Sequence, residues 1–175
     1  MADGDARAFG DLISLYQRRI HAFCARMLQD PSEAEDLAQD VFLTVYQNAK
    51  EFRGESSFTT WIYRIARNQT LNRIKYLERR GRSSRKSLDD LGEERLESED
   101  RAADDLVEGE QSVRLVRAAI EALPEQQKTV LILRDIEGLA YEEITEITGL
   151  ALGTVKSRIH RARSALAEAL SRKMS

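Results

Sequence analysis

The 175-residue chain has little of what several protein classes require. Its one cysteine, Cys24, excludes an intramolecular disulfide and a zinc site built from four thiolates. Two prolines and nine glycines are few for an all-β sandwich with many tight turns. No apolar run approaches the roughly 18 residues that a membrane span needs, and the N-terminus has no signal-peptide pattern. We therefore expect a cytoplasmic protein that does not insert into a membrane.

Residues that could carry catalysis are also scarce. The chain has two histidines, and the pair of His21 and Cys24, three residues apart, is too small a set to hold a metal. The acidic cluster between Asp135 and Glu143 has no nucleophile, histidine or glycine-rich phosphate loop beside it. We expect a protein that is not an enzyme and that binds neither a metal nor another cofactor.

The net charge of −3 hides an uneven distribution of charge. Residues 54–86 carry nine basic side chains against two acidic ones, Glu55 and Glu78. Residues 153–175 carry six basic side chains against Glu168 alone, and residues 81–110, between the two patches, are acidic. Two separate basic patches suggest two contacts with a polyanion, although a solvated helix face explains either patch alone equally well.

Apolar residues recur every three or four positions, which predicts helices, and no strand-like alternation is present. Asp30, Pro31 and Glu33 predict a helix start with a capping box, and Gly138 and Gly149 predict helix ends. We predict an all-α fold of two small helical domains. They comprise residues 1–80 and 111–175, joined by a flexible acidic linker over residues 81–110. A short helix over 141–148, a glycine turn and a basic helix over 153–170 predict a helix-turn-helix.

The last predicted helix has one apolar side and one basic side. Val155 and Ile159 fall on the apolar side, whereas Ser157 and Arg161 fall opposite them. Arginine forks onto guanine and small hydroxyl groups contact base edges or phosphate, so this face favours the DNA major groove over an exposed face of a bundle.

A second polar face is predicted on the helix over residues 58–79. Its members fall within about 80° of one another on a helical wheel: Arg64, Asn68, Asn72, Lys75 and Arg79. The loop before this helix supplies Phe52 and Arg53, and an aromatic ring beside a cationic groove is typical of single-strand binding. Core packing explains Phe58 and Trp61 better, and Phe52 stays open between the two roles.

Three parts of the chain resemble the extracytoplasmic-function (ECF) sigma factors of bacterial RNA polymerase. Residues 52–68, FRGESSFTTWIYRIARN, resemble the promoter-melting segment of that family, and residues 36–42, DLAQDVF, resemble its clamp-docking helix. The helix-turn-helix of the family is matched by residues 123–125 (LPE), 133–144 (LRDIEGLAYEEI) and 153–163 (GTVKSRIHRAR). The three matches follow the order of the family and leave out mainly the linker.

The resemblance implies a transcription initiation factor. Residues 1–80 would be sigma domain two and residues 111–175 sigma domain four. The factor would bind the clamp and flap regions of core RNA polymerase, recognise the minus-ten and minus-thirty-five elements of promoter DNA, and help to open the duplex. The acidic linker would pass through the positively charged interior of the polymerase, and an anti-sigma factor would hold the protein inactive.

Site residues follow from the resemblance. Those that would contact the polymerase or support the contact are Asp36, Gln39, Asp40 and Phe42. Those that would read the minus-ten element are Asn68 and Asn72, with Phe52 and Arg53 of the loop, and the shared helical face adds Arg64, Lys75 and Arg79 as phosphate contacts at that element. Those that would read the minus-thirty-five element are Lys156, Ser157, His160 and Arg161, helped by Arg134, Thr154, Arg158 and Arg163.

Two other functions compete with this one. A repressor or activator that uses only the helix-turn-helix would leave the asparagines and the Phe52 loop unexplained. An adaptor that binds another protein through the acidic face of the helix around Asp36–Asp40 would make both basic patches incidental. The family often has a further short helix upstream of Met1, and no further domain follows Ser175, so regulation is expected from a partner or from expression.

Overall fold

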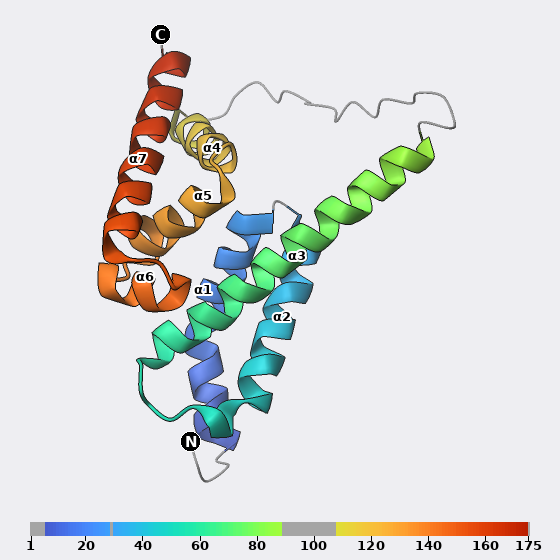
Figure 1. Cartoon of the computed structure of the whole chain (residues 1–175), viewed down its shortest axis with the longest axis vertical. Coiled ribbons are helices and arrows are strands. Elements are labelled where there is room, and N and C mark those ends of the chain that lie inside the picture. Colours follow the sequence, from blue (N-terminus) through green and yellow to red (C-terminus); the bar gives the residue numbers. More distant parts are fainter. Residues whose placement is uncertain (1–5, 29, 89–107, 175) are drawn as a thin grey trace.

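The computed structural model describes residues 6–28, 30–88 and 108–174, and these residues form helices and connecting turns without a strand (Figure 1). An N-terminal bundle contains α1 (Ala6–Leu28), α2 (Pro31–Gln47) and α3 (Phe58–Leu88), with a short 3-10 turn η1 (Ala49–Glu51) after α2. The second group contains α4 (Glu108–Glu121), α5 (Glu125–Leu131), the π-helical turn η2 (Ile132–Ile136), α6 (Tyr141–Thr148) and α7 (Leu152–Met174). The all-α prediction is confirmed for the described residues.

The N-terminal bundle follows from the apolar spacing of its three helices. Ile20, Phe23, Val41 and Ile62, from all three helices, are fully buried at its centre. As predicted, Asp30 caps α2, because its Oδ1 accepts the N–H groups of Ser32 at 2.9 Å and Glu33 at 3.1 Å.

The predicted capping role of Glu33 is not the one that the structure gives it. The Glu33 carboxylate pairs with the guanidinium of Arg73 in α3. A cation on the neighbouring helix is a stronger partner for a carboxylate than a backbone N–H, so a tertiary contact replaces the local one. Half of a capping box forms instead at α6, where Glu143 Oε2 accepts the N–H of Ala140 at 2.8 Å.

The C-terminal group is a helix-turn-helix supported by two preceding helices. Pro124 precedes α5, and Gly138 (φ +74°) and Gly149 (φ +71°) adopt the left-handed conformation that ends helices, as their positions predicted. The π-helical turn at the end of α5 was not predicted, because nothing in the local composition distinguishes one residue of extra winding.

Two boundaries differ from the sequence-based prediction. The helix expected to end at residue 79 continues to Leu88, and α4 begins at Glu108, so both enter the stretch 81–110 that was assigned to the linker. Arginine, lysine and serine tolerate a helix, and one glycine, Gly81, costs only about 1 kcal/mol. Residues 89–107 lie outside the described residues.

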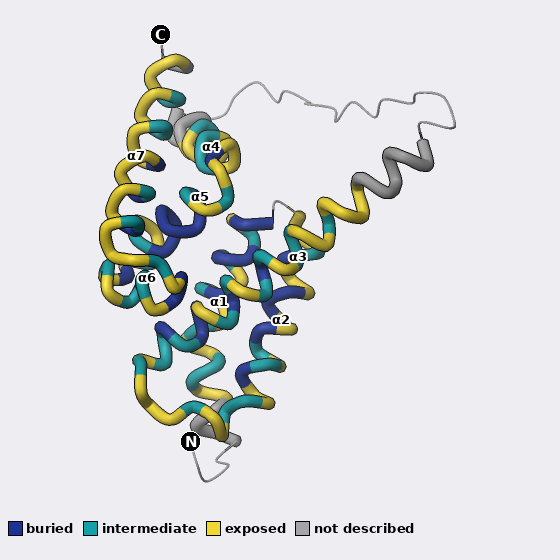
Figure 2. Tube along the Cα trace, in the orientation of Figure 1, coloured by how far each residue is buried: buried dark blue, intermediate teal, exposed yellow. Residues whose placement is uncertain are grey.

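The two groups of helices pack against each other, which the sequence did not indicate (Figure 2). Helix α6 lies on α3, and α5 touches α1. One continuous apolar core joins Ile62 and Ala66 of α3 to Leu139 and Ile144 of the C-terminal group. By contrast, Val113 and Val116 of α4, although three residues apart as in an apolar helix face, remain 59% and 39% exposed.

Candidate nucleic-acid interface

The outer face of α3 carries a row of exposed polar side chains. Its members are those predicted for the minus-ten element: Arg64, Asn68, Asn72, Lys75 and Arg79. The opposite side of the helix is buried at Ala66 and at Thr70, whose Oγ1 donates to the Ala66 carbonyl at 2.7 Å. The guanidinium of Arg67 donates to Asn68 Oδ1 at 3.0 Å, so it orients one of the two amides. The row is therefore open to a large ligand and held on a helix whose other side is packed.

An aromatic cluster lies next to this row, where the loop before α3 turns. Phe52 packs on Phe58, with ring centroids 5.8 Å apart, and on Trp61 at 5.1 Å. Gly54 has a φ of +73°, which a residue with a side chain rarely adopts. Phe52, Arg53, Trp61 and Arg64 all line one open pocket. Phe52 thus belongs to the aromatic packing and also reaches the pocket, so the two roles left open for it are compatible.

Helix α7 exposes a polar face and buries the opposite one, as predicted. Val155, Ile159 and Ala162 are buried against the preceding helices. The exposed members of the predicted set are Lys156, Ser157, His160, Arg161 and Arg163, and its half-buried members on this helix are Thr154 and Arg158. The Ser157 hydroxyl donates to the Thr154 carbonyl at 3.0 Å, which fixes its direction along the helix. This is the arrangement of a recognition helix, with its apolar side in the core and its cations outside.

Two of the predicted arginines also serve the protein itself. Arg134 donates to the Leu139 carbonyl at 2.8 Å and lies 4.7 Å from the ring centroid of Tyr141, so it braces the turn before α6. Arg163 Nε donates to Asp135 Oδ2 at 2.9 Å. An arginine that already has partners within the protein must share or lose them to bind a phosphate. These two arginines are therefore weaker candidates for DNA contact than Arg161.

The acidic face of α2 lies on the N-terminal bundle. Asp36, Gln39 and Asp40 are exposed, whereas Phe42 is half-buried and packs against the core. Arg73 of α3 reaches Asp40 Oδ2 at 3.1 Å and so ties this face to α3. Three of the four predicted polymerase-contact residues are therefore accessible. Phe42 can support them by anchoring the same helix to the core.

Comparison with known proteins matches both groups of helices. The family model of Sigma-70 region 2 matches residues 12–80, and that of Sigma-70, region 4 matches residues 114–166. The RNA polymerase sigma-H factor of Pseudomonas aeruginosa is 39% identical over 173 residues, which cover 95% of this chain and 88% of that protein. The ECF RNA polymerase sigma factor SigW of Bacillus subtilis is 36% identical over 179 residues, which cover 95% and 91%. The chain belongs to the ECF sigma factors.

A solved structure agrees with this assignment. The sigma factor RpoE in its complex with the anti-sigma factor NepR from Bartonella quintana aligns with a TM-score of 0.74 at 27% identity, covering 95% of this sigma factor and 98% of that chain. The candidate minus-ten and clamp-facing residues fall within the region 2 match, and the candidate minus-thirty-five residues, from Arg134 to Arg163, fall within the region 4 match.

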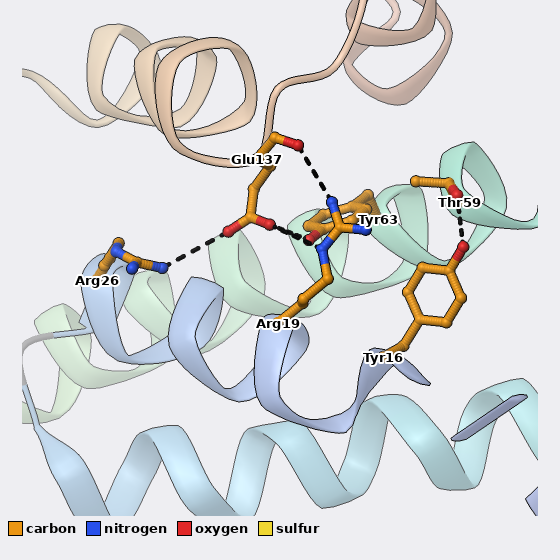
Figure 3. A network of polar contacts seen from close by, with 6 residues as sticks. All are labelled: Tyr16, Arg19, Arg26, Thr59, Tyr63 and Glu137. Carbon is orange, nitrogen blue, oxygen red and sulfur yellow. Dashed lines mark hydrogen bonds and ion pairs between the residues drawn. The ribbon is translucent and has the colours of Figure 1, made fainter. Parts of the chain in front are cut away.

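Sequence reasoning missed the polar network that joins the two regions of this sigma factor (Figure 3). Glu137 lies in the turn after η2, and its carboxylate accepts the Tyr63 hydroxyl and Arg19 Nε, the latter at 3.3 Å. Arg26 approaches the same carboxylate at 3.5 Å. Burial and the adjacent Glu137 carboxylate raise the pKa of Tyr63 far above its ordinary value. No local pattern could reveal this, because the partners are 74 or more residues apart.

The described part of this sigma factor contains neither a helix long and apolar enough to cross a membrane nor a group of three or more His, Cys, Asp or Glu residues placed to hold a metal ion. Cys24 is buried in the N-terminal core, and this burial raises the pKa of its thiol to about 11. His21, three residues earlier, is exposed. The two side chains therefore do not face a common site.

Proposed function

We propose that this ECF sigma factor binds core RNA polymerase, recognises the minus-ten and minus-thirty-five elements, and promotes strand opening at transcription initiation. The observation that carries the proposal is the exposed row on α3, in which two amides, Asn68 and Asn72, lie between cations and beside an aromatic pocket. Such a surface suits bases that have left the duplex, because aromatic rings stack on bases while cations hold the backbone.

In region 2, Asn68 and Asn72 read base edges of the opened minus-ten strand, together with Phe52 and Arg53 in the loop. The cations of the same face, Arg64, Lys75 and Arg79, hold its phosphates. On α2, the exposed residues Asp36, Gln39 and Asp40 contact the polymerase clamp, and Phe42 supports them.

In region 4, α7 enters the major groove of the minus-thirty-five element. Lys156, Ser157, His160 and Arg161 contact base edges there. Four residues at the margins of this face hold phosphates or support the helix: Arg134, Thr154, Arg158 and Arg163. The same region contacts the polymerase flap.

The structural relative RpoE was solved with an anti-sigma factor. We include control by an anti-sigma factor in the proposal on this basis. The protein acts in the cytoplasm, where the polymerase is, and it works as an initiation factor without chemistry of its own.

Run-off transcription tests the proposal. The protein is mixed with core polymerase and genomic fragments, and co-purification with the polymerase is measured in parallel. Discrete transcripts that require the protein are expected. A repressor, an activator or an adaptor would give no start sites that require the added protein, and it would not form a stable complex with core polymerase.

Variants of α2 sharpen the binding test. Asp36→Ala with Gln39→Ala should weaken co-purification, whereas Glu35→Ala, an exposed neighbour outside the predicted set, should not. Asp40 is left unchanged because its pairing with Arg73 would confuse a lost contact with a disturbed α2–α3 packing. Equal retention of polymerase by all variants would contradict the assignment of this face.

A further inference from the structure

Glu137 is a residue of region 4 whose side-chain partners all come from region 2. Its side chain is only 5% exposed. The carboxylate is held by Arg19 and Arg26 of α1 and by Tyr63 of α3, and its backbone carbonyl accepts Arg19 Nη2 at 3.1 Å (Figure 3). The contacts of this one side chain therefore connect region 4 to two helices of region 2.

The backbone around Glu137 is specialised for this position. The N–H of Glu137 donates to the Ile132 carbonyl at 2.9 Å, which closes the wide turn of η2, and Gly138 follows with a φ of +74°. This turn directs the glutamate away from its own helix bundle and toward α1 and α3 (Figure 3). A second contact supports the first: buried Lys128 of α5 donates to the Met27 carbonyl, near the end of α1, at 3.3 Å.

Another part of the same interface leaves a buried polar atom of Arg67 without a partner. Two cations, Arg67 of α3 and Arg158 of α7, line one crevice together with Glu125 of α5. The Arg67 Nε atom is buried without a hydrogen-bond partner, and such a donor costs free energy. Burial lowers the pKa of Arg67, a shift that Glu125 opposes and Arg158 reinforces. A DNA phosphate could accept the hydrogen bond that Arg67 Nε lacks in the closed arrangement.

The closed arrangement also conflicts with promoter geometry. Elements at minus ten and minus thirty-five are about 25 base pairs apart, or about 85 Å at roughly 3.4 Å per base pair. In the structure the Arg67 side chain both bonds to Asn68, a minus-ten candidate, and shares a crevice with Arg158, a minus-thirty-five candidate. The two DNA faces are therefore far too close together to read both elements at once.

We infer that Glu137 is an electrostatic clasp that holds regions 2 and 4 in a closed, self-inhibited state, which opens when the chain engages polymerase and promoter. The network around Glu137 favours closure, whereas the buried, unpartnered Nε of Arg67 near Arg158 favours opening. Closure itself concerns this chain alone, and only its inhibitory consequence rests on the proposed function.

Charge reversal at Glu137 tests the clasp. Small-angle X-ray scattering of the purified full chain measures the radius of gyration of the wild type, Glu137→Lys and Glu137→Gln. The lysine would face Arg19 and Arg26, so we expect a clear expansion and a ratio of open to closed molecules raised by about tenfold or more. Glu137→Gln keeps a hydrogen bond to Tyr63 and should expand less. Glu146→Lys, an exposed glutamate of α6, makes the same charge change away from the clasp and should stay compact.

Circular dichroism separates opening from unfolding, because a variant that only opens keeps its helix content. If Glu137→Lys loses helix, the radius of gyration of Glu137→Gln alone decides whether the clasp exists. A wild-type protein that is already expanded, folded variants as compact as the wild type, or equal expansion of Glu146→Lys would each overturn the clasp. The rate of association with core polymerase tests the inhibitory part separately. It should rise with the open fraction, and expansion without faster association would overturn self-inhibition while leaving the proposed function standing.

Discussion

The polar face of α3 in region 2 and that of α7 in region 4 offer different chemical groups. Helix α3 presents Asn68 and Asn72 between cations and beside an aromatic pocket, whereas α7 presents Arg161, His160 and Lys156. A guanidinium fork reads guanine in the intact major groove. Amides beside aromatic rings suit bases that are already unstacked. Two basic helices of one chain are thus suited to two states of DNA, which net charge alone would not distinguish.

The two regions also differ in how their helices begin. Helix α2 starts at a side-chain cap, since Asp30 accepts two backbone N–H groups. Helix α7 follows Ala151, whose carbonyl accepts the N–H groups of Thr154 at 2.9 Å and Val155 at 3.0 Å but whose side chain has no acceptor. The start of α7 therefore depends more on the packing of Val155 and Ile159 than on its own first turn.

The largest effect is expected from removing both amides of α3. Asn68→Ala with Asn72→Ala should abolish transcription from a duplex promoter, because contacts that compensate for unstacking, at a few kcal/mol per step, are lost. A template mismatched across the minus-ten region should regain much of the activity, since opening no longer has to be driven. Run-off transcription on both templates measures this.

Polymerase binding serves as a control for the double variant, because the acidic face of α2 is unchanged. Glu78→Ala, an exposed change on the same helix outside the row, should transcribe normally. A double variant as active as the wild type on the duplex would show that α3 does not read the opened strand.

Arg161→Ala should weaken binding to the duplex promoter by about 5- to 150-fold, the equivalent of about 1–3 kcal/mol for a lost bidentate base contact. Arg161→Lys keeps the charge but loses the fork, so its affinity should fall between those of Ala and wild type. Fluorescence anisotropy at moderate salt measures all three. If the alanine variant binds the duplex promoter as tightly as the wild type, Arg161 does not read a base and the role of α7 as a recognition helix is contradicted.

Arg163→Ala should have a smaller and more uniform effect than Arg161→Ala. Its guanidinium is shared with Asp135, so it can contribute a phosphate contact but little base specificity. We expect similar losses on promoter and non-promoter DNA and a salt-dependence slope lower by about 1. A loss confined to the promoter sequence would mean that Arg163 reads bases.

Asp30→Ala should lower the free energy of unfolding by about 1 kcal/mol, because the N–H groups of Ser32 and Glu33 lose their acceptor. Urea denaturation followed by circular dichroism measures the change. Asp30→Ser keeps an acceptor and should recover most of the loss, whereas an unaltered midpoint for the alanine variant would show that the cap contributes nothing.

The smallest effect is expected at the start of α7. Ala151→Ser supplies the missing acceptor and should raise the free energy of unfolding by about 0.5 kcal/mol. The same denaturation experiment measures it, with the wild-type alanine as the reference that has no side-chain cap. A destabilising serine would show that the first turn of α7 is already satisfied by its backbone contacts.

Much of the candidate site was predictable because a helical face depends only on local spacing. The buried side of α7, the exposed row on α3 and the cap at Asp30 all follow from residues within a few turns of one another. The local capping role of Glu33 was wrong because Arg73, forty residues away, competes for its carboxylate. The assignments of individual residues to promoter elements stay predictions until the variants above are measured.

The sequence by itself determined the helices, their apolar and polar sides, and the family, since each of these depends on residue order and short-range geometry. Only the tertiary structure decided how region 4 lies on region 2 and that Glu137 meets Arg19 across 118 residues. It also decided that Arg67 and Arg158 share a crevice. Apolar surface is buried without regard to direction, so spacing predicts that a face will pack but not which face it will meet. The charged residues that meet Glu137 therefore depend on which faces of the two regions pack together.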